Sequence, residues 1–237
     1  MSKDCNNKYK TIGILGGMGP KATVECFNSI IESTPAEKDQ DHIPIFIYNI
    51  PQIPDRTEAI LYGGKNPLSL LRKSAQKLDR AGADFLIIPC NTAHYYIDEI
   101  QKSVGIPIFN MIESTIDQIS EGSNVGLLAT SGTIKTGIYQ KYAEDKVNII
   151  TPSEEFQETV MNVIYGKKGV KAGYYNKELT KNMLKVVNHL KEKGAEYFIA
   201  GCTEIRLVLK DSDIEGASLL TPIDIIAQKS VQEALKK

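Results

Sequence analysis

Residues 82–94 read GADFLIIPCNTAH, and residues 194–205 read GAEYFIAGCTEI. Each stretch opens with Gly, Ala and an acidic residue, continues as a short apolar strand, and ends in a cysteine that polar residues follow. The two cysteines, Cys90 and Cys202, stand 112 residues apart in a chain of 237. A repeat of this kind indicates an internal duplication that places one cysteine at the same point of each copy.

The rest of the chain alternates short apolar strands with helical patterns. Proline follows Gly19, Asn66 and Thr221, and proline suits the first turn of a helix. Parallel strands need helical crossovers of this kind, so the alternation predicts an α/β fold. The predicted strands are residues 11–16, 43–49, 84–89 and 107–110 in the first half and 124–129, 147–150, 196–200 and 218–220 in the second.

Further anchors share the register of the repeat. Residues 12–15 match residues 125–128 at an offset of 113, and Gly19 matches Gly132 at the same offset. We therefore predict two similar, flavodoxin-like four-stranded parallel-sheet lobes, related by pseudo-twofold symmetry. The strand order expected in each lobe is 2-1-3-4.

The predicted lobes span residues 8–114 and 115–216, and a C-terminal helix at 222–237 is expected to pack back on the first lobe. In a sheet of this order, ligands bind beyond the carboxyl ends of strands 1 and 3, where the strand order reverses. Cys90 and Cys202 follow strand 3 of their lobes. If the lobes face each other, the two thiols meet in an active-site cleft between them.

Composition argues against several classes of partner. The formal net charge is −1, and no dense Lys/Arg stripe offers a surface for nucleic acid. No run of about 18 apolar residues is present to span a membrane. The first ten residues, MSKDCNNKYK, lack the apolar segment of a signal peptide, so we expect a cytoplasmic protein.

The four cysteines lack the close spacings of a zinc site, and we predict no metal. Cys5 falls in a tail that we expect to be disordered. Cys26 falls inside the helical run 21–31, where a buried small apolar side chain is the expectation. Only Cys90 and Cys202 therefore call for a chemical role.

Two opposed thiols suit the inversion of a carbon centre. Free N–H groups at a helix start favour a thiolate, so each of the two cysteines is a candidate reactive group. A thiolate can remove a proton from carbon while a thiol on the other side delivers one to the opposite face. This predicts a racemase or epimerase. Peptide N–H groups at Gly16–Gly19, Asn91 and Thr203 would stabilise the charge that develops on the substrate carboxylate.

Two further segments bear on the charge of the substrate. Residues 50–56, IPQIPDR, form a Pro-rich loop ending in Arg56, whose guanidinium could hold a carboxylate through two hydrogen bonds. Residues 165–173, YGKKGVKAG, carry Lys167, Lys168 and Lys171. Taken alone, these lysines are typical of a solvated surface patch.

Together these motifs resemble a known family. GILGGMGP (13–20), PQIPDR (51–56), PCNTAH (89–94), TSGT (130–133), GVKAG (169–173) and AGCTE (200–204) look like the cofactor-independent aspartate racemases of the aspartate/glutamate racemase family. The resemblance implies conversion of L-aspartate to D-aspartate, hence a role in D-amino acid metabolism, with no PLP and no metal. It also implies a homodimer.

The resemblance carries residue roles with it. It implies that Cys90 and Cys202 are the two bases and that Arg56 and Lys171 bind the side-chain carboxylate of the substrate. By the same resemblance, Cys90 would deprotonate the D-isomer and Cys202 the L-isomer. The other residues of the predicted substrate site are Met18, Gln52, Asn91, Thr92, Thr130, Thr133, Thr203 and Glu204.

Alternatives remain open at this point. Glutamate racemases resemble the pattern but have Asp-Ser after the first strand and His after the second Cys-Thr, where this chain has Gly17-Met18 and Glu204. A broad-specificity aspartate/glutamate racemase is still compatible with the motifs, as is a non-catalytic protein that binds acidic ligands. GMGPKA (17–22) also fits a dinucleotide-binding pattern, but the second strand lacks the acidic end which that reading needs. His94 is expected to be a packing or surface histidine rather than a base.

Overall fold

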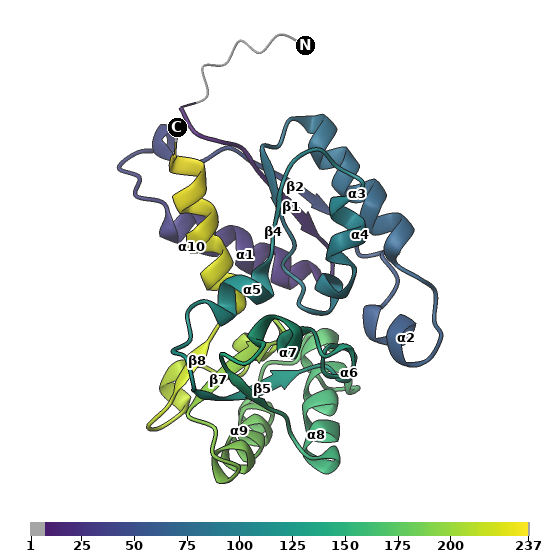
Figure 1. Ribbon diagram of the computed structural model, residues 1–237, viewed down its shortest axis with the longest axis vertical. Coiled ribbons are helices and arrows are strands. Elements are labelled where there is room, and N and C mark those ends of the chain that lie inside the picture. Colours follow the sequence, from purple (N-terminus) through teal and green to yellow (C-terminus); the bar gives the residue numbers. More distant parts are fainter. Residues whose placement is uncertain (1–7, 237) are drawn as a thin grey trace.

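The computed structural model describes residues 8–236 and contains two four-stranded parallel sheets, one from each half of the chain. The sheets run β2-β1-β3-β4 and β6-β5-β7-β8, which confirms the predicted fold and strand order. In Figure 1 the first sheet lies above the second. The strands are β1 (Ile12–Gly16), β2 (Ile45–Asn49), β3 (Phe85–Ile87), β4 (Ile108–Phe109), β5 (Asn124–Ala129), β6 (Asn148–Ile150), β7 (Tyr197–Gly201) and β8 (Ser218–Leu220).

Ten α-helices are present in the described part of the chain, and none of them is long and apolar enough to cross a membrane. They are α1 (Pro20–Ser33), α2 (Arg56–Leu61), α3 (Leu68–Ala81), α4 (Ile97–Gln101), α5 (Met111–Ile116), α6 (Ser131–Thr136), α7 (Ile138–Ala143), α8 (Glu154–Tyr165), α9 (Lys177–Glu192) and α10 (Pro222–Leu235). Short 3-10 turns at Thr92–Tyr96, Val170–Ala172 and Ile205–Leu207 carry parts of the site described below.

Two local expectations need correction. Arg56 does not end a loop but begins α2, because the carboxylate of Asp55 accepts the backbone N–H of Glu58 and caps the helix. The chain after Asn91 forms a 3-10 turn before α4 rather than one continuous α-helix. Cys26 is fully buried in α1, as predicted, whereas Cys5 lies outside the described residues.

Both faces of each sheet are covered, so the central strands are apolar on both sides. In β1, Ile12 and Ile14 pack with α1 and α10, and the neighbouring Leu15 packs on the opposite face with α3. In β7, Phe198 packs with α8 and α9, while Ile199 turns to α7. Successive side chains of a strand point to opposite faces, which explains the unbroken apolar runs in the sequence.

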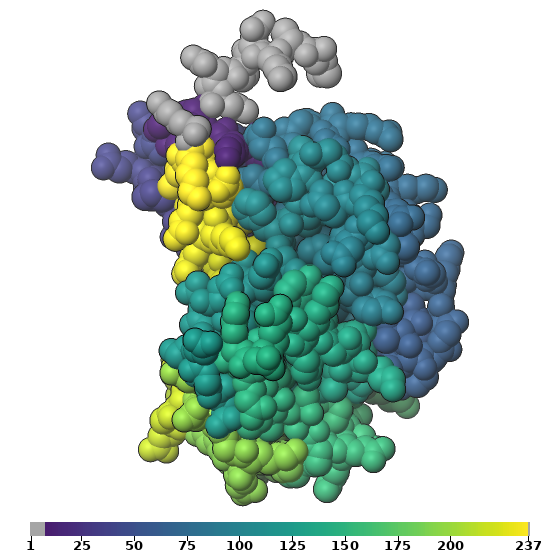
Figure 2. Space-filling model, viewed as in Figure 1, coloured from purple at the N-terminus to yellow at the C-terminus, as the bar shows by residue number. Residues whose placement is uncertain are grey.

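The last helix returns to the first half of the molecule. After β8 the chain enters α10, which lies along α1 and α5 and closes one face of the first sheet through Ile226 and Ala227. Figure 2 shows it in yellow on the flank of the upper half, with the two halves in contact over the face shown. Arg206 of the second half donates to Asp224 of α10, so this helix is also hydrogen-bonded to the half of the molecule that contains the second sheet.

A glycine found at the same place in both halves lets a large side chain of the neighbouring strand pack against the central strand. Gly13 of β1 and Gly126 of β5 occupy matching positions, and each lies under a large side chain of the neighbouring strand. A Cβ at Gly126 would stand 2.8 Å from the ring of Phe198 and 3.1 Å from Leu190. Because the interior is close-packed, only glycine fits at this point without displacing the core.

Gly126→Ala is therefore expected to lower the free energy of unfolding by about 1–3 kcal/mol, the usual cost of overpacking. Urea denaturation followed by circular dichroism measures it. Gly105→Ala is the matched control, since a Cβ there meets nothing within 4 Å. An equal effect of the two substitutions would contradict the packing argument.

Candidate active site

A small cavity lies where the carboxyl ends of the two sheets meet. Its volume is about 10 Å³, which is room for roughly one water molecule. The residues that line it come from both halves of the chain. They are Met18, Arg56, Cys90, Asn91, Thr92, Thr130, Tyr165, Lys171, Gly201, Cys202, Thr203 and Glu204.

The two cysteines of the repeat both line this cavity. Cys202 directly follows β7, and Cys90 comes three residues after β3, the equivalent strand of the first sheet. Both are free thiols with only 6% and 7% of their surface exposed. The fold therefore brings together two thiols that the sequence separates by 112 residues.

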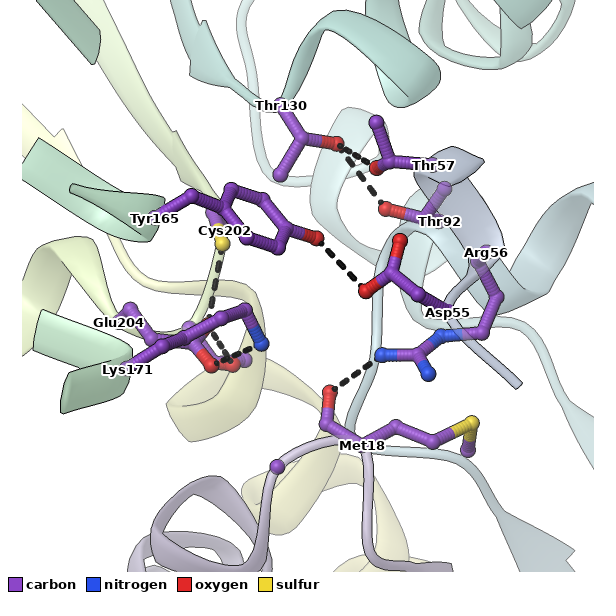
Figure 3. A network of polar contacts seen from close by, with 12 residues as sticks. Met18, Asp55, Arg56, Thr57, Thr92, Thr130, Tyr165, Lys171, Cys202 and Glu204 are labelled. Atoms are coloured by element: carbon purple, nitrogen blue, oxygen red, sulfur yellow. Dashed lines mark hydrogen bonds and ion pairs between the residues drawn. The ribbon is translucent and has the colours of Figure 1, made fainter. Parts of the chain in front are cut away.

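Threonine hydroxyls join the two halves beside the thiols. Thr92 of the first half lies 2.8 Å from Thr133 and 3.2 Å from Thr130 of the second, measured between Oγ1 atoms. Thr57, at the start of α2, donates to Thr130 at 3.4 Å. Figure 3 shows Thr57, Thr92 and Thr130 converging from different elements. All four side chains are buried, so the network fixes the relative position of the two sheet ends.

Asn91 presents an unsatisfied donor to the cavity. Its Oδ1 accepts a hydrogen bond from the hydroxyl of Tyr139, on α7 of the second half, at 2.6 Å. Its Nδ2 is buried and has no hydrogen-bond partner. Because Tyr139 occupies the carbonyl side of the amide, the NH₂ group is left to face a ligand.

Arg56 is held by carbonyl groups, and its Nε donor has no partner. Its terminal nitrogens donate to the carbonyls of Pro54 at 3.1 Å and Met18 at 3.3 Å, while Nε is buried without a partner. Burial opposes the charge on the guanidinium. Electrostatic interactions with Cys90 and Asp55 nevertheless raise the pKa of Arg56, so it stays a cation.

An ion pair stands beside Cys202. The ammonium of Lys171 lies 2.8 Å from Glu204 Oε1, and Glu204 Oε2 lies 3.0 Å from Cys202 Sγ. Burial raises the pKa of the Glu204 carboxyl, but Lys171 and the cysteine donor outweigh burial, and the net direction is down. The carboxylate is therefore ionised, and Figure 3 shows its contacts with Lys171 and with Cys202 as dashed lines.

The backbone N–H of Glu204 lowers the pKa of Cys202, as expected at a helix start, but it is the smallest of the effects that act on this thiol. Burial raises its pKa well above the ordinary value, and the charge of Glu204 raises it further, against the opposing effect of Lys171. The turn that follows, Ile205–Leu207, is a 3-10 turn of three residues and provides little dipole. Loss of solvent and a neighbouring carboxylate decide the protonation of this thiol.

The loop after β1 differs in part from its predicted role. The N–H of Gly17 donates to Thr23 Oγ1 at 2.9 Å and is therefore already bonded within the protein. Gly17 has a φ of 101°, and a Cβ there would collide with the backbone of Ile50. The loop places the carbonyl of Met18 against Arg56, so its observed contribution is to orient the guanidinium.

His94 is a packing residue, as expected. It is buried, its Nδ1 donates to the carbonyl of Cys90 at 2.9 Å, and its Nε2 accepts the backbone N–H of Met111 at 3.1 Å. Both contacts require the neutral ring with its proton on Nδ1. Burial lowers the pKa of His94 to about 4.

Most of the predicted site residues line the cavity, with two exceptions. Thr133 lies behind its wall, bonded to Thr92 and Thr130. Gln52 is exposed and is absent from the lining, so its role in binding stays a prediction. Lys167 and Lys168 are exposed, as expected of a surface patch, whereas Lys171 turns into the site with a quarter of its side chain exposed.

Sequence reasoning missed two tyrosines of the site. Tyr165, at the end of α8, donates to Asp55 of the first half at 3.0 Å and covers the cavity from the second half. Tyr139 donates a hydrogen bond to Asn91 and lies near enough to Cys202 to interact with it electrostatically. Neither stands in a motif that marks it. Only the position of Tyr165 at the border of the glycine-rich segment 165–173 gave a signal.

A larger outer cavity of about 390 Å³ adjoins the inner one and shares four lining residues with it, Met18, Arg56, Lys171 and Glu204. These four residues therefore lie where the two cavities adjoin. Among residues 8–236, no cluster of three or more His, Cys, Asp or Glu side chains is arranged to hold a metal ion.

Comparison with known proteins identifies the family. The sequence model of the family described as Asp/Glu/hydantoin racemase matches residues 15–229. The solved structure of an aspartate racemase from Picrophilus torridus superposes with a TM-score of 0.82 at 30% identity, covering 96% of both chains.

Two curated relatives carry different substrate names. The broad specificity amino-acid racemase RacX of Bacillus subtilis is 29% identical over 203 residues, which cover 84% of this chain and 87% of the relative. A glutamate racemase of Aquifex pyrophilus is 30% identical over 166 residues, which cover 65% of this chain and 61% of the relative. The comparisons therefore support amino-acid racemisation without fixing the amino acid.

Tyr139→Phe is expected to lower the free energy of unfolding by about 1–3 kcal/mol, because it leaves the buried Asn91 Oδ1 without its donor. Urea denaturation measures the change. Tyr95→Phe serves as the control, since Tyr95 is about half exposed. No loss of stability in the Tyr139 variant would show that the hydrogen bond is replaced or unimportant.

The low pKa of buried His94 leads us to predict that the free energy of unfolding decreases in acid. The unfolded chain takes up a proton near the ordinary histidine pKa of about 6.5, whereas folded His94 resists protonation down to about 4. Unfolding is therefore favoured progressively as the pH falls through that window, by up to about 3 kcal/mol. ¹⁵N NMR should show a neutral ring with its proton on Nδ1 at pH 5.5. Urea denaturation at several pH values measures how the free energy of unfolding changes with pH, and the part of that change due to this residue should be absent in His94→Asn.

Proposed function

The chain belongs to the Asp/Glu/hydantoin racemase family, and from that membership we propose that it interconverts the L and D forms of an acidic amino acid, most directly aspartate. Cys90 and Cys202 are the two bases of the proposed mechanism. One observation carries the proposal: thiols from equivalent strand ends of two matching sheets line a single buried cavity.

The unpartnered donors support a carboxylate ligand. Asn91 Nδ2 and Arg56 Nε are buried in the cavity wall without an acceptor. A buried polar group without a hydrogen bond lowers the free energy of unfolding by about 1–3 kcal/mol, so such a group in a cavity wall indicates a site for a ligand or a water molecule. A carboxylate has acceptor sites for both, and a bound amino acid would relieve the deficit.

The charge of the cavity favours an acidic amino acid. Lys171 is a cation paired with the anion Glu204, whereas the buried cation Arg56 forms no salt bridge with a carboxylate in the described part of the chain. An amino acid with a carboxylate side chain carries one net negative charge near neutral pH. A neutral or basic amino acid would leave the buried charge uncompensated.

The proposed reaction moves two protons. The thiolate of one cysteine takes the Cα proton, and the bonding electrons stay on Cα and spread onto the α-carboxylate. The S–H of the other cysteine then gives its proton to the opposite face of Cα, and its electron pair stays on sulfur. Hydrogen bonds from the buried donors would stabilise the negative charge that develops between these steps. The mechanism needs no cofactor.

Aspartate is the preferred candidate because the Picrophilus relative is named an aspartate racemase. A broad-specificity aspartate/glutamate racemase is the second candidate. It is supported by the RacX relative and by the outer cavity, which would accept a longer side chain past Arg56 and Lys171. We retain the assignment of Cys90 to the D-isomer and Cys202 to the L-isomer as part of the proposal.

Proton NMR in D₂O with purified protein, and no PLP or metal added, tests the proposal. The wild type should exchange the Cα proton of L- and D-aspartate and form the opposite enantiomer. Cys90→Ser and Cys202→Ser should each slow racemisation by about 10²–10⁴-fold, because each removes one proton-transfer group.

Cys26→Ser is the matched control, since Cys26 is a buried free thiol in α1, away from the cavity. It should leave racemisation unchanged. Glutamate in place of aspartate, with the same readout, separates the two candidate substrates. Absence of Cα exchange with both amino acids would contradict the proposed function.

A further inference from the structure

Glu204 is in contact with three polar groups at once. Its carboxylate pairs with Lys171 Nζ at 2.8 Å, lies 3.0 Å from Cys202 Sγ, and accepts the hydroxyl of Thr203 at 3.1 Å. Only 7% of the residue is exposed, so solvent does not screen these contacts. Figure 3 shows the carboxylate beneath the sulfur atom of Cys202 and beside the end of Lys171.

The direction of the hydrogen bond follows from the charge of Glu204. An ionised carboxylate only accepts, so the short contact with Cys202 Sγ requires the sulfur to donate and to carry its proton. A Cys202 thiolate would place two negative charges 3.0 Å apart in a buried site, with Lys171 as the compensating cation. The geometry therefore favours the thiol form of Cys202.

Cys90 has a different environment. Two cations interact with it, the guanidinium of Arg56 and, more weakly, the ammonium of Lys171. Beside Cys202, by contrast, stands a carboxylate. The two thiols of the repeat thus occupy equivalent positions in the fold but opposite electrostatic surroundings.

We propose that Glu204 is a positioning residue that keeps the proton on Cys202 in the free enzyme, so that the free enzyme is ready for the D-isomer, with Cys90 as the base and Cys202 as the acid. The inference rests on the proposed racemase function for its catalytic meaning. The step itself breaks the Cα–H bond, with the proton passing to Cys90 Sγ, and breaks the Cys202 S–H bond, with its proton passing to the other face of Cα.

The remaining groups around Cys202 do not replace Glu204 in this role. Tyr139 and Tyr165 face it from α7 and α8, and burial raises the pKa of both, so they are neutral at physiological pH. Lys171 acts in the opposite direction, because its positive charge favours a thiolate. Glu204 is the carboxylate that contacts Cys202 in the described part of the chain.

Alkylation by iodoacetamide tests the proposal without relying on catalysis. Only the thiolate reacts, so the rate of modification of each cysteine against pH, followed by mass spectrometry of its peptide, reports its protonation. In Glu204→Gln, Cys202 should react at lower pH and about tenfold or more faster at pH 8 than in the wild type, as expected for a pKa lower by about one unit or more. Glu204→Asp, which keeps the charge, should restore much of the wild-type profile.

Cys90 provides the internal control in the same samples. If Glu204 merely supported the fold, its loss would speed the alkylation of both cysteines alike. The proposal requires a shift at Cys202 with little change at Cys90, and an unchanged Cys202 profile would overturn it. Lys171→Gln is the second variant: it removes the opposing cation and should slow the alkylation of Cys202. A protein that alkylates as expected but does not racemise would contradict the proposed function and not this role of Glu204.

Discussion

The structure depends on polar contacts that cross between the two sheet ends. Thr92 bonds to Thr130 and Thr133, Asn91 bonds to Tyr139, and Asp55 bonds to Tyr165, so each of these pairs joins one half of the chain to the other. Each buried partner would be left unsatisfied if the halves shifted. The contacts therefore hold the two loops that carry Cys90 and Cys202 in one relative position, which the βα repeats alone would not specify.

The small inner cavity has a consequence for the proposed substrate. A volume of about 10 Å³ is too small for an amino acid, so binding would require side chains that line the cavity to move. The groups at which the inner and outer cavities adjoin include Lys171 and Glu204, and Tyr165 covers the site through its bond to Asp55. Exclusion of water around a bound substrate would strengthen the electrostatic interactions inside, which suits the abstraction of a weakly acidic proton.

The duplication made the fold predictable, because the apolar strands and helices recur periodically in both halves. It also made the shared position of Cys90 and Cys202 predictable, because the two halves align at a nearly constant offset. The protonation of Cys202 was not predictable, since it depends on burial and on the orientation of Glu204, a side chain two residues away. Nor did the pattern reveal Tyr139, whose hydroxyl meets Asn91 across 48 residues of sequence. Local patterns specify elements, whereas contacts between side chains of distant elements appear only once those elements are packed.

The ion pair of Lys171 and Glu204 links substrate binding to protonation. In the proposed complex the side-chain carboxylate of the substrate competes with Glu204 for the same ammonium. Any movement of Lys171 towards the substrate withdraws positive charge from Cys202, which strengthens the hold of that sulfur on its proton. The proton then leaves only when negative charge develops on Cα nearby. An acidic substrate would thus favour the thiol form of Cys202, which is the proton donor in the proposed reaction. A substrate without a second carboxylate would leave Lys171 paired with Glu204.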